Sequence, residues 1–327
     1  MPAKKKPRVL SGIQPSGSLH IGNYFGMMKP MLAYQERAEL FIFLVNYHAL
    51  TSVFDGPRLA QDTLEMAADW LALGLDPDKT VFWVQSDVKE VVELTWILST
   101  VASMGLLERC HSYKDKIAQG LTPNHALFAY PVLMAADILA YNAEIIPVGQ
   151  DQKQHVEVTR DIGQRFNHIY GQTFVLPESQ IGEETAAVPG LDGQKMSKSY
   201  DNTIEIFADE PTLRQKVMKI VTDSTPVDEP KNPDRCNLFA LFRLFAGKDE
   251  VEDLRRRYLA PGLRYGDVKI ELFERIRDFF APFAAERNRL LKDPGHVRDV
   301  LRQGAEKARS VCSPVMDEVR RKVGLLY

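Results

Sequence analysis

The sequence has 327 residues, of which 45% are hydrophobic, and its net charge is −3. This length suggests about two domains, and the apolar content excludes a globally disordered chain. The small net charge gives no indication of a nucleic-acid partner, and no DNA partner is expected. The three cysteines are widely spaced, which argues against a disulfide framework and a cysteine-built zinc site. No apolar run is long enough to span a membrane, and no apolar core follows the basic start MPAKKKPRVL, so neither a membrane partner nor a secretory signal is expected. We therefore expect a soluble cytoplasmic protein.

The first half of the chain alternates between the patterns of buried strands and amphipathic helices. Strands are predicted at residues 8–13, 39–50 and 80–87, and a further strand with its exit loop at residues 143–151. Helices are predicted at residues 22–37, 57–75 and 152–166, with Pro30 kinking the first helix. Continuously apolar strands that are separated by helices form parallel sheets covered on both faces. The pattern therefore predicts an α/β fold with a doubly wound, Rossmann-like parallel sheet.

The character of the sequence changes in its second half. Residues 90–142 have mostly helical patterns, residues 178–203 are rich in loop-forming residues, and every patterned segment after residue 203 is helical. We therefore predict a domain boundary near residue 203. Residues 1–203 would form a Rossmann-like catalytic domain with a helical insertion at about residues 90–142, and residues 204–327 would form a helical domain.

The stretch SGSLHIGN (16–23) follows the first predicted strand with small and polar residues. A helix that begins near His20 presents unpartnered N–H groups and the positive end of its dipole, which favour an anion. Gly17 and Gly22 would let a phosphate approach the backbone. His20 and Asn23 lie one helical turn apart, so both could donate to phosphate oxygens. A tight turn with a capping serine and a surface histidine is the alternative.

A second polar stretch, QKMSKSYDN (194–202), carries two lysines in a glycine-bearing loop. Lys195 and Lys198 flank Met196 and Ser197. Two ammonium groups on a mobile loop could cover a polyphosphate and follow negative charge onto a leaving group. A solvated basic loop is the alternative, and composition alone favours it.

The two stretches are far more specific together than apart. H-I-G-N after the first strand and K-M-S-K-S after the last resemble the two ATP motifs of class I aminoacyl-tRNA synthetases. Four ordered segments, SGIQPSGSLHIGNY, YPVLMAADILAY (130–141), PVGQDQKQH (147–155) and DGQKMSKS (192–199), are similar to the bacterial tryptophanyl-tRNA synthetase family. The resemblance covers nearly the whole chain. It implies the class I catalytic fold and a C-terminal helical domain that binds the tRNA anticodon.

The resemblance also implies which residues handle ATP. The implied catalytic residues are His20, Asn23, Lys116, Lys195 and Lys198. The implied ATP contacts are Gln14, Pro15, Ser16, Gly22, Asn23, Gly149, Gln150, Asp151, Val188, Lys195, Met196, Ser197, Lys198 and Ser199. Asp151 ends a strand, where it can accept from ribose hydroxyls or cap a helix. Many family members have Glu in place of Gln150, so no charge is expected there. His48 matches a family position, but its neighbours Asn46 and Tyr47 do not, and it stays outside the predicted site.

Asp137 lies inside the apolar run PVLMAADILA, where a lone carboxylate is costly unless it is hydrogen-bonded. It could bind a neighbouring backbone amide. The resemblance implies instead that it accepts the indole N–H of tryptophan, which is a donor only. Met134 would pack on the indole ring, and Tyr130 and Gln152 would lie near the substrate amine and carboxylate. Core packing for Met134 and helix-end positions for the other two are the alternatives.

The activity that the resemblance implies is the ATP-dependent attachment of L-tryptophan to tRNA(Trp). The reaction passes through tryptophanyl-adenylate and releases pyrophosphate and AMP, in a homodimer whose interface lies in residues 90–142. Mg²⁺ would be held chiefly by the ATP phosphates, so no separate metal site is expected. Three alternatives stay open: a tyrosyl-tRNA synthetase, a small-molecule nucleotidylyltransferase, and a synthetase-like RNA-binding protein without catalysis. The MAADIL and GQDQKQH runs favour tryptophan, and the intact ATP motifs favour an enzyme.

Overall fold

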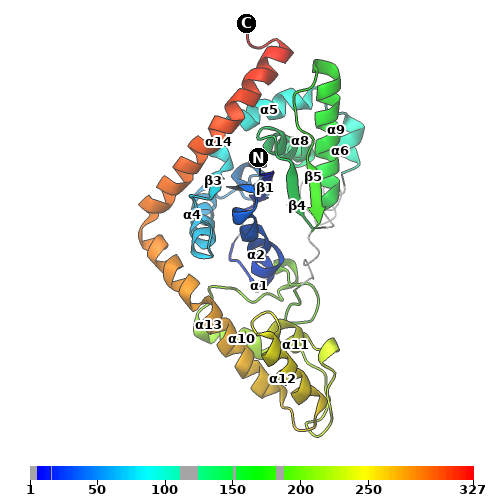
Figure 1. The fold of residues 1–327 in the computed structure, drawn as a ribbon, viewed down its shortest axis with the longest axis vertical. Helices are drawn as coiled ribbons and strands as arrows, with labels where there is room; N and C mark the ends of the chain where they lie inside the picture. Colours follow the sequence, from blue (N-terminus) through cyan, green and yellow to red (C-terminus); the bar gives the residue numbers. More distant parts are fainter. Residues whose placement is uncertain (1–5, 16, 111–123, 150–151, 182–187) are drawn as a thin grey trace, which may run out of the picture. The chain divides into compact units, whose positions relative to one another are not determined.

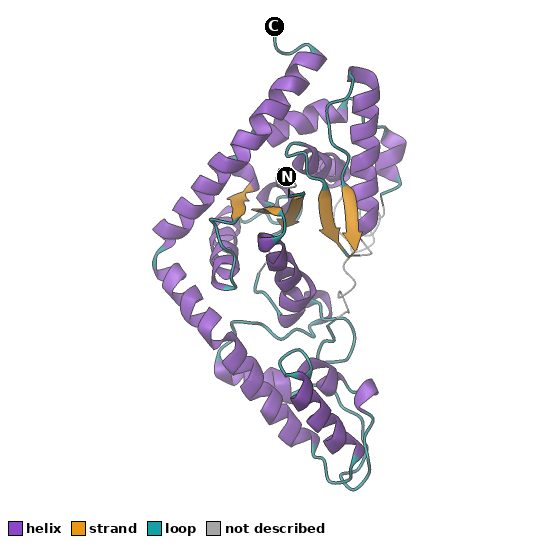
Figure 2. Cartoon of the chain, in the orientation of Figure 1, coloured by secondary structure: helices purple, strands orange, loops and turns teal. Residues whose placement is uncertain are grey.

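The computed structural model describes residues 6–15, 17–110, 124–149, 152–181 and 188–327 (Figures 1 and 2). The chain divides into two units. Unit 1 comprises residues 1–16, 31–182 and 290–327, and unit 2 comprises residues 17–30 and 183–289. The two units do not follow the predicted boundary at residue 203. The segment 290–327 groups with unit 1, and the segments 17–30 and 183–203 group with unit 2.

A five-stranded parallel sheet in the order β3-β2-β1-β4-β5 forms the centre of unit 1 (Figure 1). Its strands are β1 (Arg8–Ile13), β2 (Glu39–Leu44), β3 (Thr80–Val84), β4 (Ile145–Val148) and β5 (Glu178–Ile181). Leu10 pairs in register with Phe41, and Phe41 with Val81, so the apolar residues of β1, β2 and β3 lie side by side. The predicted doubly wound parallel sheet is therefore confirmed, although β5 was not predicted and β2 ends earlier than expected.

Helices of unit 1 follow β2, β3 and β4. They are α3 (Asn46–Ala49), α4 (Gly56–Ala72), α5 (Glu90–Ser99), α6 (Met104–Glu108), α8 (His125–Leu139) and α9 (Lys153–Tyr170). Local sequence sets their starts: the Asp55 side chain accepts from the Arg58 N–H and Pro57 stands in the first turn of α4, while the Asn124 side chain caps α8. Helix α3 begins two residues after β2 ends, and a 3₁₀ turn (Gln85–Asp87) follows β3 directly.

The segment that joins β1 to β2 is helical but irregular. It runs through α1 (Ile21–Asn23), a π-helical stretch (Tyr24–Met28), α2 (Lys29–Leu32) and a 3₁₀ turn (Ala33–Glu36). The prediction of a helix with an irregularity at Pro30 is consistent with this. Proline has no N–H for the usual i−4 carbonyl, and the wider turn, in which the Lys29 N–H bonds to the Tyr24 carbonyl, lies immediately before it.

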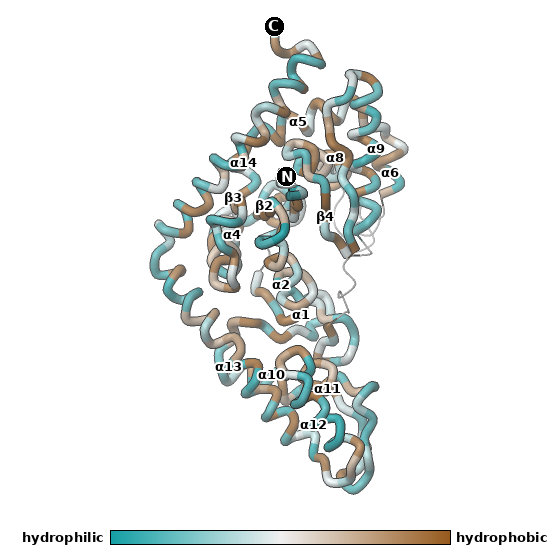
Figure 3. The backbone as a smooth tube through the Cα atoms, in the orientation of Figure 1, coloured by the Kyte–Doolittle hydropathy of each residue, from teal (hydrophilic) through white to brown (hydrophobic). Residues whose placement is uncertain are grey.

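Helix α14 (Pro294–Val323) covers the β3 edge of the sheet. Its buried residues include Ala305, Ala308, Cys312, Met316 and Val319, which join the core cluster of unit 1. In Figure 3 the helix alternates between brown and teal along its length, as expected of a helix with one buried face. At Gly304 the approach is so close that a Cβ atom would lie 1.7 Å from the Phe82 carbonyl oxygen of β3. An edge strand that is covered in this way cannot pair with another chain.

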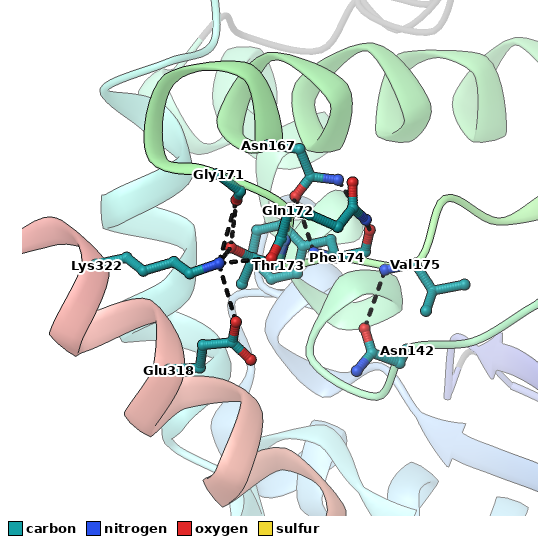
Figure 4. Close-up of polar contacts among 9 residues, drawn as sticks. All are labelled: Asn142, Asn167, Gly171, Gln172, Thr173, Phe174, Val175, Glu318 and Lys322. Carbon is teal, nitrogen blue, oxygen red and sulfur yellow. Dashed lines mark hydrogen bonds and ion pairs between the residues drawn. The ribbon is translucent and has the colours of Figure 1, made fainter.

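The end of α14 also binds the end of α9 (Figure 4). The Lys322 ammonium donates to the carbonyls of Gly171 at 3.3 Å and Gln172 at 2.5 Å and to the Thr173 hydroxyl at 2.9 Å, and it pairs with Glu318 at 2.9 Å. Gly171 is the C-cap of α9, and the other two acceptors follow it in the chain. Lys322 therefore links the last turn of α14 to the segment by which the chain leaves α9.

Unit 2 combines short helices with a long one and contains both stretches that were singled out as ATP motifs. Its helices are α10 (Glu210–Met218), α11 (Asn237–Phe242), α12 (Lys248–Leu259) and α13 (Tyr265–Lys292), the last of which ends in unit 1. Six aromatic rings pack at centroid distances of 4.9–6.2 Å and join residues 24–25 to α13: Tyr24, Phe25, Phe245, Phe279, Phe280 and Phe283. The beginning of the first helical segment is thus part of the core of unit 2.

Candidate active site

His20 and Asn23 cap the helix α1 reciprocally. The His20 Nδ1 accepts from the Asn23 N–H at 3.2 Å, and the Asn23 Oδ1 accepts from the His20 N–H at 3.0 Å. Because Nδ1 is an acceptor, the neutral imidazole carries its proton on Nε2. The capping therefore leaves the His20 Nε2–H and the Asn23 Nδ2 amide as the remaining donors of these two side chains.

The N–H groups of the first turn have partners within the protein. Ile21 N–H donates to the Ile204 carbonyl at 3.0 Å, and Gly22 N–H points to the Met196 sulfur at 3.4 Å. A Cβ at Gly22 would lie 3.2 Å from the Met196 Cβ. The glycine therefore admits the side chain of the lysine-bearing loop. The expectation of open amides at this helix start is not met in this structure, since loop residues occupy them.

Burial and a neighbouring lysine keep His20 neutral. His20 is 6% exposed, and desolvation by burial, followed by the positive charge of Lys198, lowers the pKa of His20 from 6.5 to about 4, while Glu205 opposes the shift. Residue 20 also pairs with residue 205 in a short antiparallel bridge. The histidine is therefore a neutral hydrogen-bond donor at pH 7, beside the cationic Lys198.

The lysine-bearing loop folds back on itself before it reaches His20. Met196 N–H donates to the Val188 carbonyl at 2.9 Å, and residues 189 and 195 form a short antiparallel bridge. The Ser197 hydroxyl accepts from the Ser199 N–H and starts a 3₁₀ turn (Lys198–Tyr200). Lys195, Lys198 and Ser199 are exposed, whereas Met196 and Val188 are buried. Unit 2 thus brings His20, Asn23, Gly22, Met196 and Lys198 together, as the two motifs predicted.

Asp137 forms the centre of a buried polar cluster in unit 1. It is 2% exposed and lies in α8. Its Oδ2 lies 2.9 Å from the His48 Nε2, and the Gln85 side-chain amide donates to Oδ1 at 2.9 Å and to Oδ2 at 2.8 Å. Burial raises the pKa of Asp137, and the bonds from His48 and Gln85 oppose the rise. The partners are side chains, so the alternative of a bond to a neighbouring backbone amide does not apply to these contacts.

His48 and Gln85 were not among the predicted site residues. His48 lies in α3 after β2, and Gln85 follows β3. Both therefore stand at the carboxyl ends of neighbouring parallel strands, where ligands bind in such sheets. The signal for His48 was its agreement with one family position. Gln85 carried no signal beyond its place at a strand end.

Tyr130 and Gln152 meet through a third residue, His155. The Tyr130 hydroxyl lies 3.0 Å from the His155 Nε2, and the Gln152 Oε1 lies 2.7 Å from the His155 Nδ1. The rings of Tyr130 and His48 have centroids 6.2 Å apart, so this chain of contacts continues towards the Asp137 cluster. Met134, half-buried, packs against the hydrophobic core of unit 1. His155 was missed, although it ends the quoted PVGQDQKQH segment.

Several predicted residues lie elsewhere. Gln14 is exposed, Pro15 is buried, and the half-buried Gly149 accepts from the Gln152 N–H at 3.0 Å through its carbonyl. Ser16, Lys116, Gln150 and Asp151 lie outside the described residues. Within the parts of the chain that the structure describes, no group of three His, Cys, Asp or Glu could hold a metal ion.

The arginines of α12 are occupied by acidic partners. Arg255 forms two bonds to Asp234 at 2.7 and 3.1 Å, Arg256 pairs with Asp253 at 3.0 Å, and Arg257 with Glu271 at 2.6 Å. Exposed pairs of this kind contribute little to stability, but they neutralise the local charge. The run of three arginines is therefore not a free basic patch.

Known proteins resemble the chain over nearly all of its length. A family profile described as tRNA synthetases class I (W and Y) matches residues 2–281. The chain is 52% identical over 318 residues to the tryptophan–tRNA ligase of Campylobacter jejuni, with 97% of this chain and 100% of the relative covered. It is 51% identical to that of Rhodopirellula baltica, with 97% and 99% covered. The crystal structure of the Campylobacter jejuni tryptophanyl-tRNA synthetase complexed with ADP and tryptophan superimposes with a TM-score of 0.94 at 52% identity, covering 97% and 100% of the two chains.

Proposed function

The chain belongs to the class I tRNA synthetases of the tryptophan and tyrosine type, and from this membership we propose that it attaches L-tryptophan to tRNA(Trp), using ATP, through a tryptophanyl-adenylate. The observation that carries the proposal is the 52% identity to a tryptophan–tRNA ligase over 97% of the chain. The matching structure at TM-score 0.94 contains tryptophan and ADP. The tyrosine-specific and non-catalytic alternatives are not favoured, because the relatives at this level of identity are tryptophan–tRNA ligases.

The proposal assigns tryptophan to the polar cluster of unit 1. Asp137 accepts the indole N–H, since an ionised carboxylate offers about four acceptor positions and the bonds from His48 and Gln85 use three. Tyr130 and Gln152, held by His155, contact the amine and the carboxylate. Met134 packs on the indole ring. The cluster supplies one acceptor for the single donor of the side chain.

The phosphates of ATP are assigned to residues of unit 2. His20 and Asn23 donate from Nε2 and Nδ2, and Lys195 and Lys198 supply positive charge to the phosphates as pyrophosphate leaves. The tryptophan carboxylate attacks the α-phosphate, so the step requires positioning and charge stabilisation and no protein nucleophile. The other proposed ATP contacts are Gln14, Pro15, Ser16, Gly22, Gly149, Gln150, Asp151, Val188, Met196, Ser197 and Ser199, and Lys116 is proposed as a further catalytic lysine.

Mg²⁺ is proposed to accompany ATP. Mg²⁺ retains water and binds mainly through substrate phosphates in many nucleotide enzymes. The described residues contain no group of three or more His, Cys, Asp or Glu side chains that could hold a metal ion. When bound, the ion would neutralise charge on the phosphate oxygens.

The tRNA and the second subunit are proposals as well. We assign the anticodon to helices α10–α13. For a homodimer, α5 and α6 offer an exposed apolar surface: Trp96 is 75% exposed, Val92 48% and Met104 63%. Analytical ultracentrifugation tests the proposed dimer interface, and the Trp96→Glu protein should sediment as a monomer. Phe54→Glu is the control, because Phe54 is an apolar residue that is 85% exposed outside these helices; this protein should remain a dimer. A Trp96→Glu protein that stays dimeric contradicts the assigned interface.

No helix in the described parts of the chain combines the length and apolar character needed to cross a bilayer. We propose that the protein works in the cytoplasm, where charged tRNA is used.

The decisive experiment is ATP–pyrophosphate exchange with the purified protein. Exchange should depend on tryptophan and be far slower with tyrosine, and tRNA(Trp) should become charged. Exchange that tyrosine supports equally well, or none with either amino acid, would overturn the proposed function.

A further inference from the structure

Asn202 fastens the loop that carries Lys195 and Lys198. It is 2% exposed, and its side chain bonds on both sides of Met196. The Oδ1 accepts from the Ser197 N–H at 2.8 Å, and the Nδ2 donates to the Lys195 carbonyl at 3.2 Å. Both halves of the carboxamide thus hold the main chain between the two lysines.

The same amide reaches the other arm of the loop. The Nδ2 also donates to the Asp192 carboxylate at 2.7 Å, and the Asn202 carbonyl accepts from the Leu191 N–H at 3.0 Å. Gly190 leaves the space for this side chain, because a Cβ there would lie 2.3 Å from the Nδ2. Asn202 therefore ties residues 191–192 to residues 195–197 through one buried group.

The residue between the fastened positions is the one that touches the helix start. Met196 accepts from the Gly22 N–H at 3.4 Å, and its Cβ fills the space beside Gly22. Gly22 stands between His20 and Asn23, the capping pair. The contacts thus run without interruption from Asn202 through the loop backbone and Met196 to the His20 segment, all within unit 2.

We propose that Asn202 is a positioning residue for the chemical step, which sets where Lys195 and Lys198 stand relative to His20. This inference rests on the proposed function. Only a carboxamide can perform the role, because the site requires one acceptor for Ser197 and donors for Asp192 and the Lys195 carbonyl. Aspartate would keep the shape but lose both donors and place a second carboxylate beside Asp192. A lysine displaced by about 1 Å can lose on the order of 100-fold in rate.

Three variants test the inference in tryptophan-dependent ATP–pyrophosphate exchange. Asn202→Ala and Asn202→Asp should lower kcat on the order of 100-fold and leave tryptophan affinity, measured by fluorescence titration, unchanged. Asn167→Ala is the matched control. Its carboxamide makes three similar main-chain bonds, to Thr173 and Phe174 in unit 1, and its loss should lower thermal stability while kcat is kept. If the Asn202→Ala protein does not fold, the Asn202→Asp protein provides the test.

A mutant cycle separates positioning from simple destabilisation. If Asn202 acts through the two lysines, adding Asn202→Ala to the Lys195→Ala/Lys198→Ala protein should not slow it further. Multiplying effects, or a kcat for Asn202→Ala equal to that of the wild type, would overturn the inference while leaving the proposed function intact. A wild-type protein without tryptophan-dependent exchange would instead refute the proposed function itself.

Discussion

The His48 Nε2 lies 2.9 Å from the Asp137 Oδ2, joining the residue that follows β2 to a carboxylate buried inside α8. The side-chain amide of Gln85, which follows β3, donates to both carboxylate oxygens of Asp137. An isolated buried carboxylate would take up a proton. Here two donors from the ends of neighbouring strands oppose the effect of burial, so the carboxylate is held in place as an acceptor.

We expect Asp137→Ala to narrow the preference for tryptophan over phenylalanine. Phenylalanine lacks the indole donor and would leave the acceptor unpaired, a penalty of about 2–3 kcal/mol. The preference is measured as the ratio of kcat/KM for tryptophan to kcat/KM for phenylalanine in the exchange reaction. Asp69→Ala is the control, since it removes another buried carboxylate of unit 1, in α4. An equal fall of kcat/KM for both amino acids in the Asp137 variant would refute the acceptor role.

Lys198→Ala should slow adenylate formation much more than it weakens tryptophan binding. The lysine lies beside His20 and is proposed to act on charge that develops as pyrophosphate leaves, so its loss falls on the transition state. We expect kcat to fall by about 100-fold or more. Lys219→Ala removes an exposed lysine of the same unit and should keep the wild-type rate. Pyrophosphate exchange that is unchanged in the Lys198 variant contradicts the assignment.

His20 should remain neutral through the physiological pH range. Its pKa is lowered to about 4 in the folded chain, chiefly by burial and then by Lys198. The unfolded chain therefore binds the proton more tightly, so this residue lowers the free energy of unfolding as pH falls from about 6.5 to about 4 and adds nothing further below that. NMR titration of the imidazole checks the value. A midpoint near 6.5 would disprove the burial argument, and Lys198→Ala should raise the midpoint.

Gly304→Ala should destabilise unit 1. Its Cβ would lie 1.7 Å from the Phe82 carbonyl oxygen, and main chain cannot move aside as a flexible side chain can. Forced separation of α14 from β3 should lower the free energy of unfolding by about 3 kcal/mol. Urea denaturation measures the change. Gly266→Ala, in α13 where no atom lies within 4 Å of the new Cβ, should be neutral or stabilising, and equal losses in both variants would contradict the contact.

The sequence could predict the sheet because its central strands are continuously apolar, and it could predict both ATP motifs because each is contiguous. It missed β5, whose residues Glu178–Ile181 are mostly polar and exposed at the sheet edge. The strand is formed by pairing with β4, in which Glu178 aligns with Ile145. Such pairing leaves no periodic pattern in a four-residue strand.

The predicted division at residue 203 differs from the two units for a related reason. Helical character alone does not show which core a helix joins. The buried stripe of α14, which includes Ala308 and Cys312, resembles that of any amphipathic helix, and its partner β3 lies far away in sequence. His155 and Gln85 were missed because each acts through contacts with distant residues, Tyr130 and Asp137. Their roles depend on tertiary structure.

The cover that α14 provides for β3 has a consequence during biosynthesis. The ribosome makes Thr80–Val84 early, and the chain from 85 to 293 must emerge before the covering helix does. Throughout that interval the β3 edge has no helix of its own to cover it and can pair with edges of other nascent chains. Stop codons or nicks upstream of α14 should therefore produce aggregates and not a smaller soluble fragment.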